Sequence, residues 1–361
     1  MTKSPIYMIA FMLVYFSWNC NQSTQKSKTP IRFQRVSSSP FIPQETNTFY
    51  SKLVANPAVT EFKQTLFLFF RGQSESGHDQ IGMWTTPTKN ADGLHWLYHH
   101  PVPIIPVSPE SSAPDDLHIL DPAAIAKADS LFLYYTGKSS TSEPGHSVCL
   151  AISTDGINFK KYVKNPVIKG GIAPEVILHD NLFYLFYQKK ESGERWGIYL
   201  TTSSNGIEFD TAKNVRVFGP SGKPGTFDEH SVATGRIFRE GEYYYMTYGG
   251  CAHYLDYPEN IGLARSIDLI HWERYTDNPV FIRGEQGSWD EGALWFPTVR
   301  KFGGRYMMWY EGAGTGMGME TDSARKESNK ARQEEYGGYL KTSFSQIGAA
   351  IYEGSFQEAW K

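Results

Sequence analysis

Short apolar and aromatic runs recur along the chain, and each ends in a polar turn. Five such runs follow one another at intervals of about fifty to seventy-five residues, and they lie at 66–70, 131–135, 182–187, 243–248 and 306–310. Runs of five or six residues rich in Phe, Tyr and Leu favour β-strands. No long stretch has the 3.6-residue apolar period of a helix. The pattern therefore predicts an all-β chain, with one helix in a charged insertion near 322–335.

A turn motif follows these runs. Ser-Thr-Asp-Gly-Ile-Asn-Phe at 153–159 matches Ser-Ser-Asn-Gly-Ile-Glu-Phe at 203–209 and Ser-Ile-Asp-Leu-Ile-His-Trp at 266–272. Weaker copies lie at 92–96 and 345–347. Asp-Gly or Asn-Gly between strand-like residues is a strong hairpin signal. Run and turn together define a unit of four strands that occurs five times.

A four-stranded unit cannot cover its own two faces, but units stacked around an axis can. We therefore predict a five-bladed β-propeller of four-stranded antiparallel blades at residues 48–361. Residues 31–47 are predicted to close the ring by adding a strand to the last blade, which would remove two exposed sheet edges. The predicted blades span 48–106, 107–169, 170–220, 221–284 and 285–361.

The first twenty residues have the pattern of an export signal. Lys3 precedes an apolar run at 6–16, which is too short to span a bilayer comfortably. Cys20 and a polar stretch follow, as in bacterial lipoproteins, so residues 21–47 are predicted to be a polar tether and ring-closing segment. We expect an exported protein, in the periplasm or on the outer membrane, that touches membrane only through a lipid on Cys20. Ordinary secretion and a retained anchor are the alternatives.

Composition narrows the function classes. The 361 residues include 35 basic and 38 acidic side chains, with a net charge of −3, which disfavours a nucleic-acid partner. The 40% of hydrophobic residues excludes disorder. The 15% of aromatic residues fits both strand packing and stacking on sugars. Cys149 and Cys251 lie in strand patterns and are predicted to be buried free thiols; no zinc motif and no cofactor site is predicted.

Two sets of residues are predicted to share one face of the ring, because strand direction alternates within a blade. The starts of the inner strands line the mouth of the axial channel, and the loops between second and third strands form its rim. An acidic pair precedes three inner strands, at 115–116, 228–229 and 290–291. The first member of each pair is expected to cap a turn or join blades, and the second is expected to face a ligand.

The rim loops and inner-strand starts supply the binding candidates. Loop polar groups are more often solvated, His230 and His253 fit either a structural or a ligand-binding role, and Trp196 and Trp295 fit either blade packing or sugar stacking. The substrate-binding candidates are Arg71, His78, Asp79, Arg195, Trp196, His230, His253, Trp295 and Glu311.

The Ser-x-Asp-Gly-Ile-x-Phe/Trp turns, the Asn-Pro-Val segments at 165–167 and 278–280, and the run from Gly287 to Tyr310 resemble one superfamily. It is that of the five-bladed propeller glycosidases, which include arabinanases, invertases, levansucrases and mannoside phosphorylases (glycoside hydrolase families 43, 32, 68, 117 and 130). The resemblance covers roughly residues 50–350. It implies an oligosaccharide substrate cleaved by a carboxylic acid that protonates the leaving oxygen and a second carboxylate that activates water or attacks the sugar.

The resemblance also implies roles for particular residues. Asp121, before Pro122, matches the family's orienting Asp. Glu175, after Pro174, is the best match for its acid. Blade one departs from the pattern, because Asn56 stands where the family has its base or nucleophile. That group must then come from elsewhere, with Asp79, Glu229 or Glu291 as examples, so the catalytic candidates are Asp121, Glu175, Glu229 and Glu291.

Three functions remain open from the sequence. The first is an exported glycoside hydrolase acting on oligosaccharides from polysaccharide breakdown. The second is a phosphorylase, which would need a cationic cluster drawn from Arg71, Lys189, Lys190 and Arg195. The third is a surface glycan-binding propeller without catalysis. Some relatives carry a calcium ion in the channel, but no motif here establishes one, and the sugar, the stereochemical outcome and the oligomeric state are left open.

Overall fold

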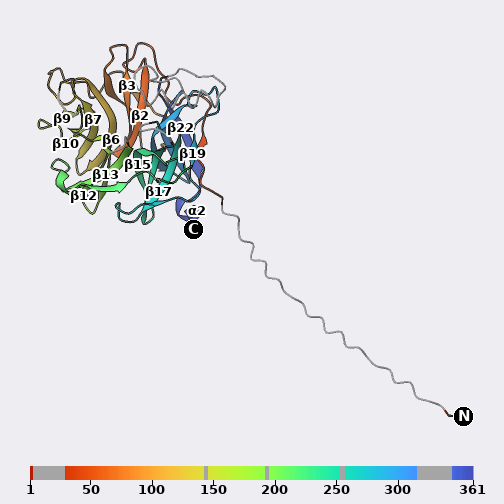
Figure 1. Ribbon diagram of the computed structural model, residues 1–361. Coiled ribbons are helices and arrows are strands. Elements are labelled where there is room, and N and C mark those ends of the chain that lie inside the picture. The colour runs from red at the N-terminus through yellow and green to blue at the C-terminus, as the bar shows by residue number, and fades with distance from the viewer. Residues whose placement is uncertain (3–28, 142–144, 192–194, 253–256, 315–343, 361) are drawn as a thin grey trace.

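The predicted propeller is confirmed. The computed structural model describes residues 1–2, 29–141, 145–191, 195–252, 257–314 and 344–360. Its strands form five antiparallel sheets arranged in a ring (Figure 1). Residues 3–20 of the predicted export signal and the predicted helix near 322–335 lie outside the described residues. In the described parts of the chain, no helix combines the length and the apolar character needed to cross a bilayer.

The first four blades are each built from strands that follow one another in the sequence. Blade one contains β2 (Leu53–Phe62), β3 (Thr65–Gln73), β4 (Asp79–Pro87) and β5 (Tyr98–His99). Blade two contains β6 (His118–Lys127), β7 (Ser130–Lys138), β8 (His146–Ser153), β9 (Lys160–Lys161) and β10 (Ile168–Lys169). Blade three contains β11 (Ile172–His179), β12 (Leu182–Glu191), β13 (Arg195–Ser203), the 3₁₀ turn η1 (Thr211–Lys213) and β14 (Val215–Phe218).

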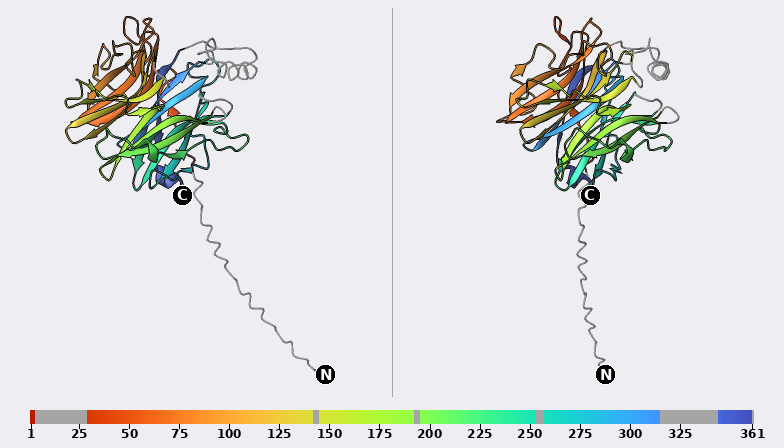
Figure 2. Two further views of the ribbon diagram at one scale, coloured as in Figure 1. Left: turned by 60° about the vertical axis from the view of Figure 1, so that its left-hand side comes forward. Right: turned by 90° about the vertical axis from the view of Figure 1, so that its left-hand side faces the viewer.

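The last two blades complete the ring (Figure 2). Blade four contains β15 (Ser231–Glu240), β16 (Tyr243–Cys251), β17 (Asn260–Ser266), β18 (Glu273–Arg274) and β19 (Phe281–Ile282). Blade five contains β20 (Ala293–Phe302), β21 (Arg305–Ala313), β22 (Gln346–Glu353) and β1 (Gln34–Arg35), and the helix α2 (Phe356–Trp360) follows it. Because β1 pairs with β22, the last blade joins the two ends of the propeller.

Aromatic side chains of the second strands pack one blade against the next. Phe132 of blade two meets Phe183 of blade three with ring centroids 4.9 Å apart. Phe356 of α2 lies between blades four and five. Its ring centroid is 5.3 Å from that of Tyr245 and 4.7 Å from that of Tyr306. The aromatic content of the chain therefore mainly reflects the contacts between blades.

The first member of each acidic pair is structural. Asp115, Asp228 and Asp290 are each at most 2% exposed, and each accepts a hydrogen bond from a tyrosine of the second strand. Each also pairs with a cation from an outer strand. The tyrosine and the cation are Tyr135 and Lys161 for Asp115, Tyr248 and Arg274 for Asp228, and Tyr310 and Arg35 for Asp290. A buried carboxylate held in this way joins the inner, second and outer strands of its blade.

The turn motif owes its residues to hydrogen bonds. Ser153 Oγ accepts from the backbone N–H of Asp155 and Gly156, and Asp155 Oδ1 accepts from Ile157 and Asn158. Gly156 has φ +82°, a conformation that glycine adopts freely. The other copies repeat these bonds through Ser203 and Ser266. The motif therefore fixes the turn after the third strand of its blade.

Ring closure gives a stability prediction. Arg35 of β1 bonds Asp290 at 2.8 Å, and Asp290 is 1% exposed. Arg35→Ala leaves that carboxylate without its cation, so we expect the free energy of unfolding to fall by about 2 kcal/mol. Urea-induced unfolding measures the change. Arg32→Ala removes an exposed arginine bonded only to backbone carbonyls, and it is the control. Equal losses in both variants would contradict a specific role for the Arg35–Asp290 pair.

Candidate active site

All five inner strands bulge at the same place. The bulge residues have φ between 49° and 55°, and the pairing with the second strand shifts register there. Four of them precede proline and one precedes glycine. They are Asn56, Asp121, Ala173, Thr234 and Phe296. Because this left-handed backbone recurs in every blade, it is a property of the fold, and only the side chain at each position distinguishes one blade from another. Asp121 is the one acidic residue in this ring of five.

The bulges surround a cavity of about 660 Å³ at the axis. All five bulge residues line it, together with residues from the ends of the second and third strands. The other lining groups include Lys52, Arg71, Asp79, His118, Thr136, Lys138, His146, Gln188, Trp295, Glu311 and Ser345. Five sequence candidates therefore meet in one space, namely Arg71, Asp79, Asp121, Trp295 and Glu311.

Glu311 is a buried carboxyl group in the cavity wall with a raised pKa. Asn56 donates its backbone N–H and its side-chain amide to Glu311 Oε2 at 3.2 and 3.0 Å, and Ser345 Oγ donates to Oε1 at 2.5 Å. Burial raises the pKa of Glu311 to about 7, with Asp121 adding to the rise, although Arg71 and the hydrogen bonds oppose it. Glu311 therefore keeps its proton up to near-neutral pH, as a general acid must.

Asp121 supplies the second carboxylate. Its side chain is 9% exposed, and its Oδ2 accepts a hydrogen bond from the backbone N–H of Ala173 at 3.3 Å. Arg71 feels the negative charges of Asp79, Glu311 and Asp121, so its guanidinium group places a positive charge among three carboxyl groups. Asp121 and Glu311 thus share one environment but differ in exposure and hydrogen bonding.

Asp79 is held as an anion beside the two catalytic candidates. Arg71 Nε donates to Asp79 Oδ1 at 2.6 Å, and His118 Nδ1 lies 2.8 Å from Oδ2. Burial alone would raise the pKa of Asp79, but the charge of Arg71 and the contacts with His118 outweigh burial and lower it. With both oxygens occupied, Asp79 orients Arg71 and His118 rather than acting as a base.

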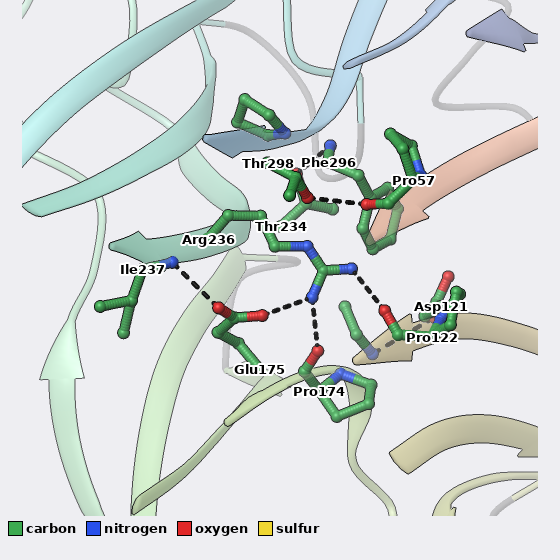
Figure 3. Close-up of polar contacts among 12 residues, drawn as sticks. Pro57, Asp121, Pro122, Pro174, Glu175, Thr234, Arg236, Ile237, Phe296 and Thr298 are labelled. Carbon is green, nitrogen blue, oxygen red and sulfur yellow. Dashed lines mark hydrogen bonds and ion pairs between the residues drawn. The ribbon is translucent and has the colours of Figure 1, made fainter. Parts of the chain in front are cut away.

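Glu175 does not line the cavity, so the structure does not bring it together with Asp121 and Glu311. It belongs to the next layer along the axis, with Ala58, Ala123, Arg236 and Thr298, two residues after each bulge. Glu175 Oε2 accepts from Arg236 at 2.8 Å, and Oε1 accepts from the backbone N–H of Ile237 at 3.0 Å (Figure 3). Its carboxylate therefore forms an ion pair beneath the cavity instead of reaching the substrate.

Arg236 joins three blades in the layer next to the cavity. Its guanidinium group donates to the backbone carbonyls of Pro174 at 2.7 Å and Pro122 at 3.0 Å, and it lies over the Phe296 ring at 4.8 Å (Figure 3). Pro122 and Pro174 directly follow two bulge residues. Arg236 thus ties the bulges of blades two and three to blade four and fixes the backbone next to Asp121.

Glu229 and Glu291 also lie outside the cavity lining. Glu229 Oε2 accepts from the backbone N–H of Gly225 at 2.7 Å, and Glu291, which is fully buried, accepts from the backbone N–H of Gly287. Asp116 accepts from the backbone and hydroxyl of Ser140. The expectation that the second acidic residue of each pair faces a ligand is therefore wrong, because these side chains bond the neighbouring loops.

The remaining candidates divide by position. Trp295 lines the cavity, but its ring packs edge-on against Tyr257 with centroids 5.9 Å apart. Trp196 donates its backbone N–H to Ser231, and His78 bonds the carbonyl of Leu117. Besides the glutamates, His78, Arg195 and Trp196 are absent from the cavity lining. His230 is likewise absent from the lining, and His253 lies outside the described residues.

Sequence reasoning missed several cavity residues. His118 was not singled out, although it stands three residues before Asp121, where the other blades have Leu53, Gly170, Ser231 and Ala293. That break in the repeat was the available signal. Lys138 ends the second strand of the same blade and was also missed. Within the described residues, no group of three or more His, Cys, Asp or Glu side chains is arranged to hold a metal ion.

Comparison with known proteins shows a similarity of fold to solved structures. No protein-family model matches the sequence, and no curated protein matches it. Among solved structures, an N-acetylgalactosamine deacetylase from F. plautii, in complex with blood group B trisaccharide, has a TM-score of 0.62 and 15% identity. The match covers 91% of this chain and 97% of that one.

Two other solved structures have a similar fold. A glycosyl hydrolase from Bacteroides ovatus gives a TM-score of 0.61 and 16% identity over 90% of this chain and 94% of its own. A β-1,2-mannobiose phosphorylase from Listeria innocua has a TM-score of 0.62 and 13% identity. That match covers 89% of this chain and 96% of the phosphorylase. At these identities the likeness concerns the fold. The chain is a five-bladed β-propeller, and it shares this fold with solved structures of glycosidases and a mannobiose phosphorylase.

Proposed function

We propose that this chain is an exported glycoside hydrolase that cleaves an oligosaccharide in the axial cavity. The observation that carries the proposal is the convergence of Asp121 and Glu311 on one cavity, with the pKa of Glu311 raised to about 7. Glu311 is the acid that protonates the leaving oxygen. Asp121 is the second carboxylate, which activates water or attacks the sugar. This assignment replaces Glu175 and keeps Asp121.

Another cavity group fits this chemistry. Arg71 sets a positive charge beside both carboxyl groups, which stabilises the negative charge left on Glu311 after proton transfer.

Turnover on a panel of aryl glycosides and of plant and algal oligosaccharides tests the proposal. We expect hydrolysis of at least one substrate by the wild type and by Glu229→Gln, because Glu229 bonds a loop outside the cavity. Release of a sugar 1-phosphate that requires inorganic phosphate would identify a phosphorylase instead. Binding without turnover would identify a glycan-binding propeller, and either result would contradict the hydrolase.

A further inference from the structure

Three basic residues stand in one row across blade two. His118 of β6 pairs directly with Lys138 of β7, and Lys138 pairs directly with His146 of β8. Directly paired residues of antiparallel strands project to the same face, with Cβ atoms about 5 Å apart. All three line the axial cavity. The row therefore presents up to three positive charges at one wall of the proposed catalytic site.

Nothing within blade two explains this row as a stabilising feature. Like charges placed directly opposite each other on a sheet are destabilising. Asp79 of blade one bonds His118, but no ion pair joins Lys138 or His146 to an acidic residue within the described ranges. Burial, together with the positive charges of Lys138 and His118, lowers the pKa of His146. An anion bound in the cavity would favour the protonated form of His146 beside Lys138.

The row adjoins the neutralised part of the cavity wall, because His118 contacts Asp79. Arg71 is already paired with Asp79, so its charge is largely balanced. Lys138 and His146 are half-buried and line the cavity, and neither side chain bonds another residue within the described ranges. A lysine ammonium group and an imidazole beside it are suited to an oxyanion with several acceptor oxygens, and such charge-assisted hydrogen bonds are strong.

We propose that His118, Lys138 and His146 form a subsite for an anionic substituent of the sugar, a uronate carboxylate or a sulfate ester. The substrate of the proposed hydrolase is then an acidic oligosaccharide. Only the cleavage of this substrate rests on the proposed function, because binding of the acidic group can be measured without cleavage. Asp121 and Glu311 act on the glycosidic bond, and the row fixes the position of the acidic ring. Neutral oligosaccharides of the same linkage lack this anchor and bind more weakly.

Calorimetric titration tests the subsite independently of turnover. Glu311→Gln protein is titrated with uronate-containing, sulfated and neutral oligosaccharides of matched length. We expect acidic ligands of one kind to bind at least about tenfold more tightly than neutral ones, and the preference to weaken with salt. Which acidic ligand binds distinguishes the carboxylate from the sulfate. Equal affinity for neutral and acidic ligands would overturn the proposal.

Substitutions locate the site. Lys138→Met should lower affinity for the acidic ligand about tenfold or more and leave the neutral ligand within about twofold. His146→Gln is a second variant, which keeps the test decisive if Lys138→Met unfolds. Lys160→Met removes an exposed lysine of β9 on the same blade and is the matched control. Loss of acidic selectivity in Lys160→Met, or its persistence in both row variants, would contradict the subsite.

The outcomes separate this proposal from the catalytic one. Selective acidic binding without turnover by the wild type supports the subsite and contradicts the hydrolase. Equally efficient hydrolysis of neutral and acidic oligosaccharides, with both unchanged in Lys138→Met, supports the hydrolase and overturns the subsite. Competition by inorganic phosphate at millimolar concentration, with a sugar 1-phosphate as product, would assign the row to free phosphate and likewise overturn the proposal.

Discussion

Glu311→Gln should lower turnover by at least about a hundredfold, because the amide cannot transfer a proton to the leaving oxygen. Glutamine suits the site: its amide group can donate to Ser345 Oγ and its carbonyl can accept from Asn56, as a protonated Glu311 would. The fold should therefore persist. Steady-state kinetics on the substrate found in the panel measures the loss, with Glu229→Gln as the control for removing a carboxylate outside the cavity.

The pH dependence adds a second readout for Glu311. With the pKa near 7, wild-type turnover should fall as pH rises through about 7, and this limb should be absent from the residual activity of Glu311→Gln. The folded state holds a proton between the ordinary value of 4.5 and about 7 that the unfolded state releases. Wild-type stability therefore declines as pH rises through this window, and Glu311→Gln should be at least as stable as the wild type above pH 7.

Glu311 also has a structural alternative. It occupies the position of Thr136 and Gln188, whose side chains accept from the bulge N–H of the next blade, as Glu311 does from Asn56. If Glu311→Gln keeps wild-type turnover, its carboxyl group merely links blade five to blade one. A large loss of turnover with unchanged unfolding at neutral pH would separate catalysis from this link.

Asp121→Asn should also lower turnover about a hundredfold, since asparagine neither activates water nor attacks the sugar. Asparagine tolerates the φ of +55° at this position, and its carbonyl oxygen can still accept from Ala173. The charge of Asp121 is one cause of the raised pKa of Glu311. The alkaline limb of the pH profile should therefore move to lower pH in this variant.

A shift of the alkaline limb of the pH profile in Asp121→Asn would show that Asp121 and Glu311 act in one site. Without such a shift, their effects on turnover would be separate. Turnover measured across pH in wild type and Asp121→Asn gives both the size of the loss and the position of the limb. Asp116→Asn, whose carboxylate bonds Ser140 outside the cavity, is the matched control and should leave both unchanged. An unmoved limb in Asp121→Asn, or near-wild-type turnover, would contradict the assignment of Asp121.

The sequence predicted the fold because each blade repeats its own local signals. Aromatic runs gave the second strands, and the Ser-x-Asp-Gly turns placed the ends of the third strands, as at Ser153 and Ser203. The sequence also aligns the inner-strand starts at Asp121, Ala173 and Thr234, and the structure has a bulge at each. These features depend on residues close together in the chain, so a single sequence reveals them.

The same alignment failed for Glu175 because it did not resolve depth along the axis. Glu175 stands two residues after the bulge, in the layer of Arg236 and Thr298, while Asp121 is itself a bulge residue. A difference of two positions keeps a strand residue on the same face but moves it about 7 Å along the axis. The carboxylate of Glu175 therefore pairs with Arg236 and does not line the cavity.

The sequence by itself determined an all-β repeat, its five blades and Asp121 as a candidate. The tertiary structure alone decided which acidic groups meet. Glu311 of blade five reaches Asn56 of blade one, 255 residues away in the chain, because the ring closes through β1 and β22. Burial in that contact raises the pKa of Glu311, and pairing across blades fixes Asp79. Desolvation and charge proximity depend on distance in space, which local sequence patterns do not contain.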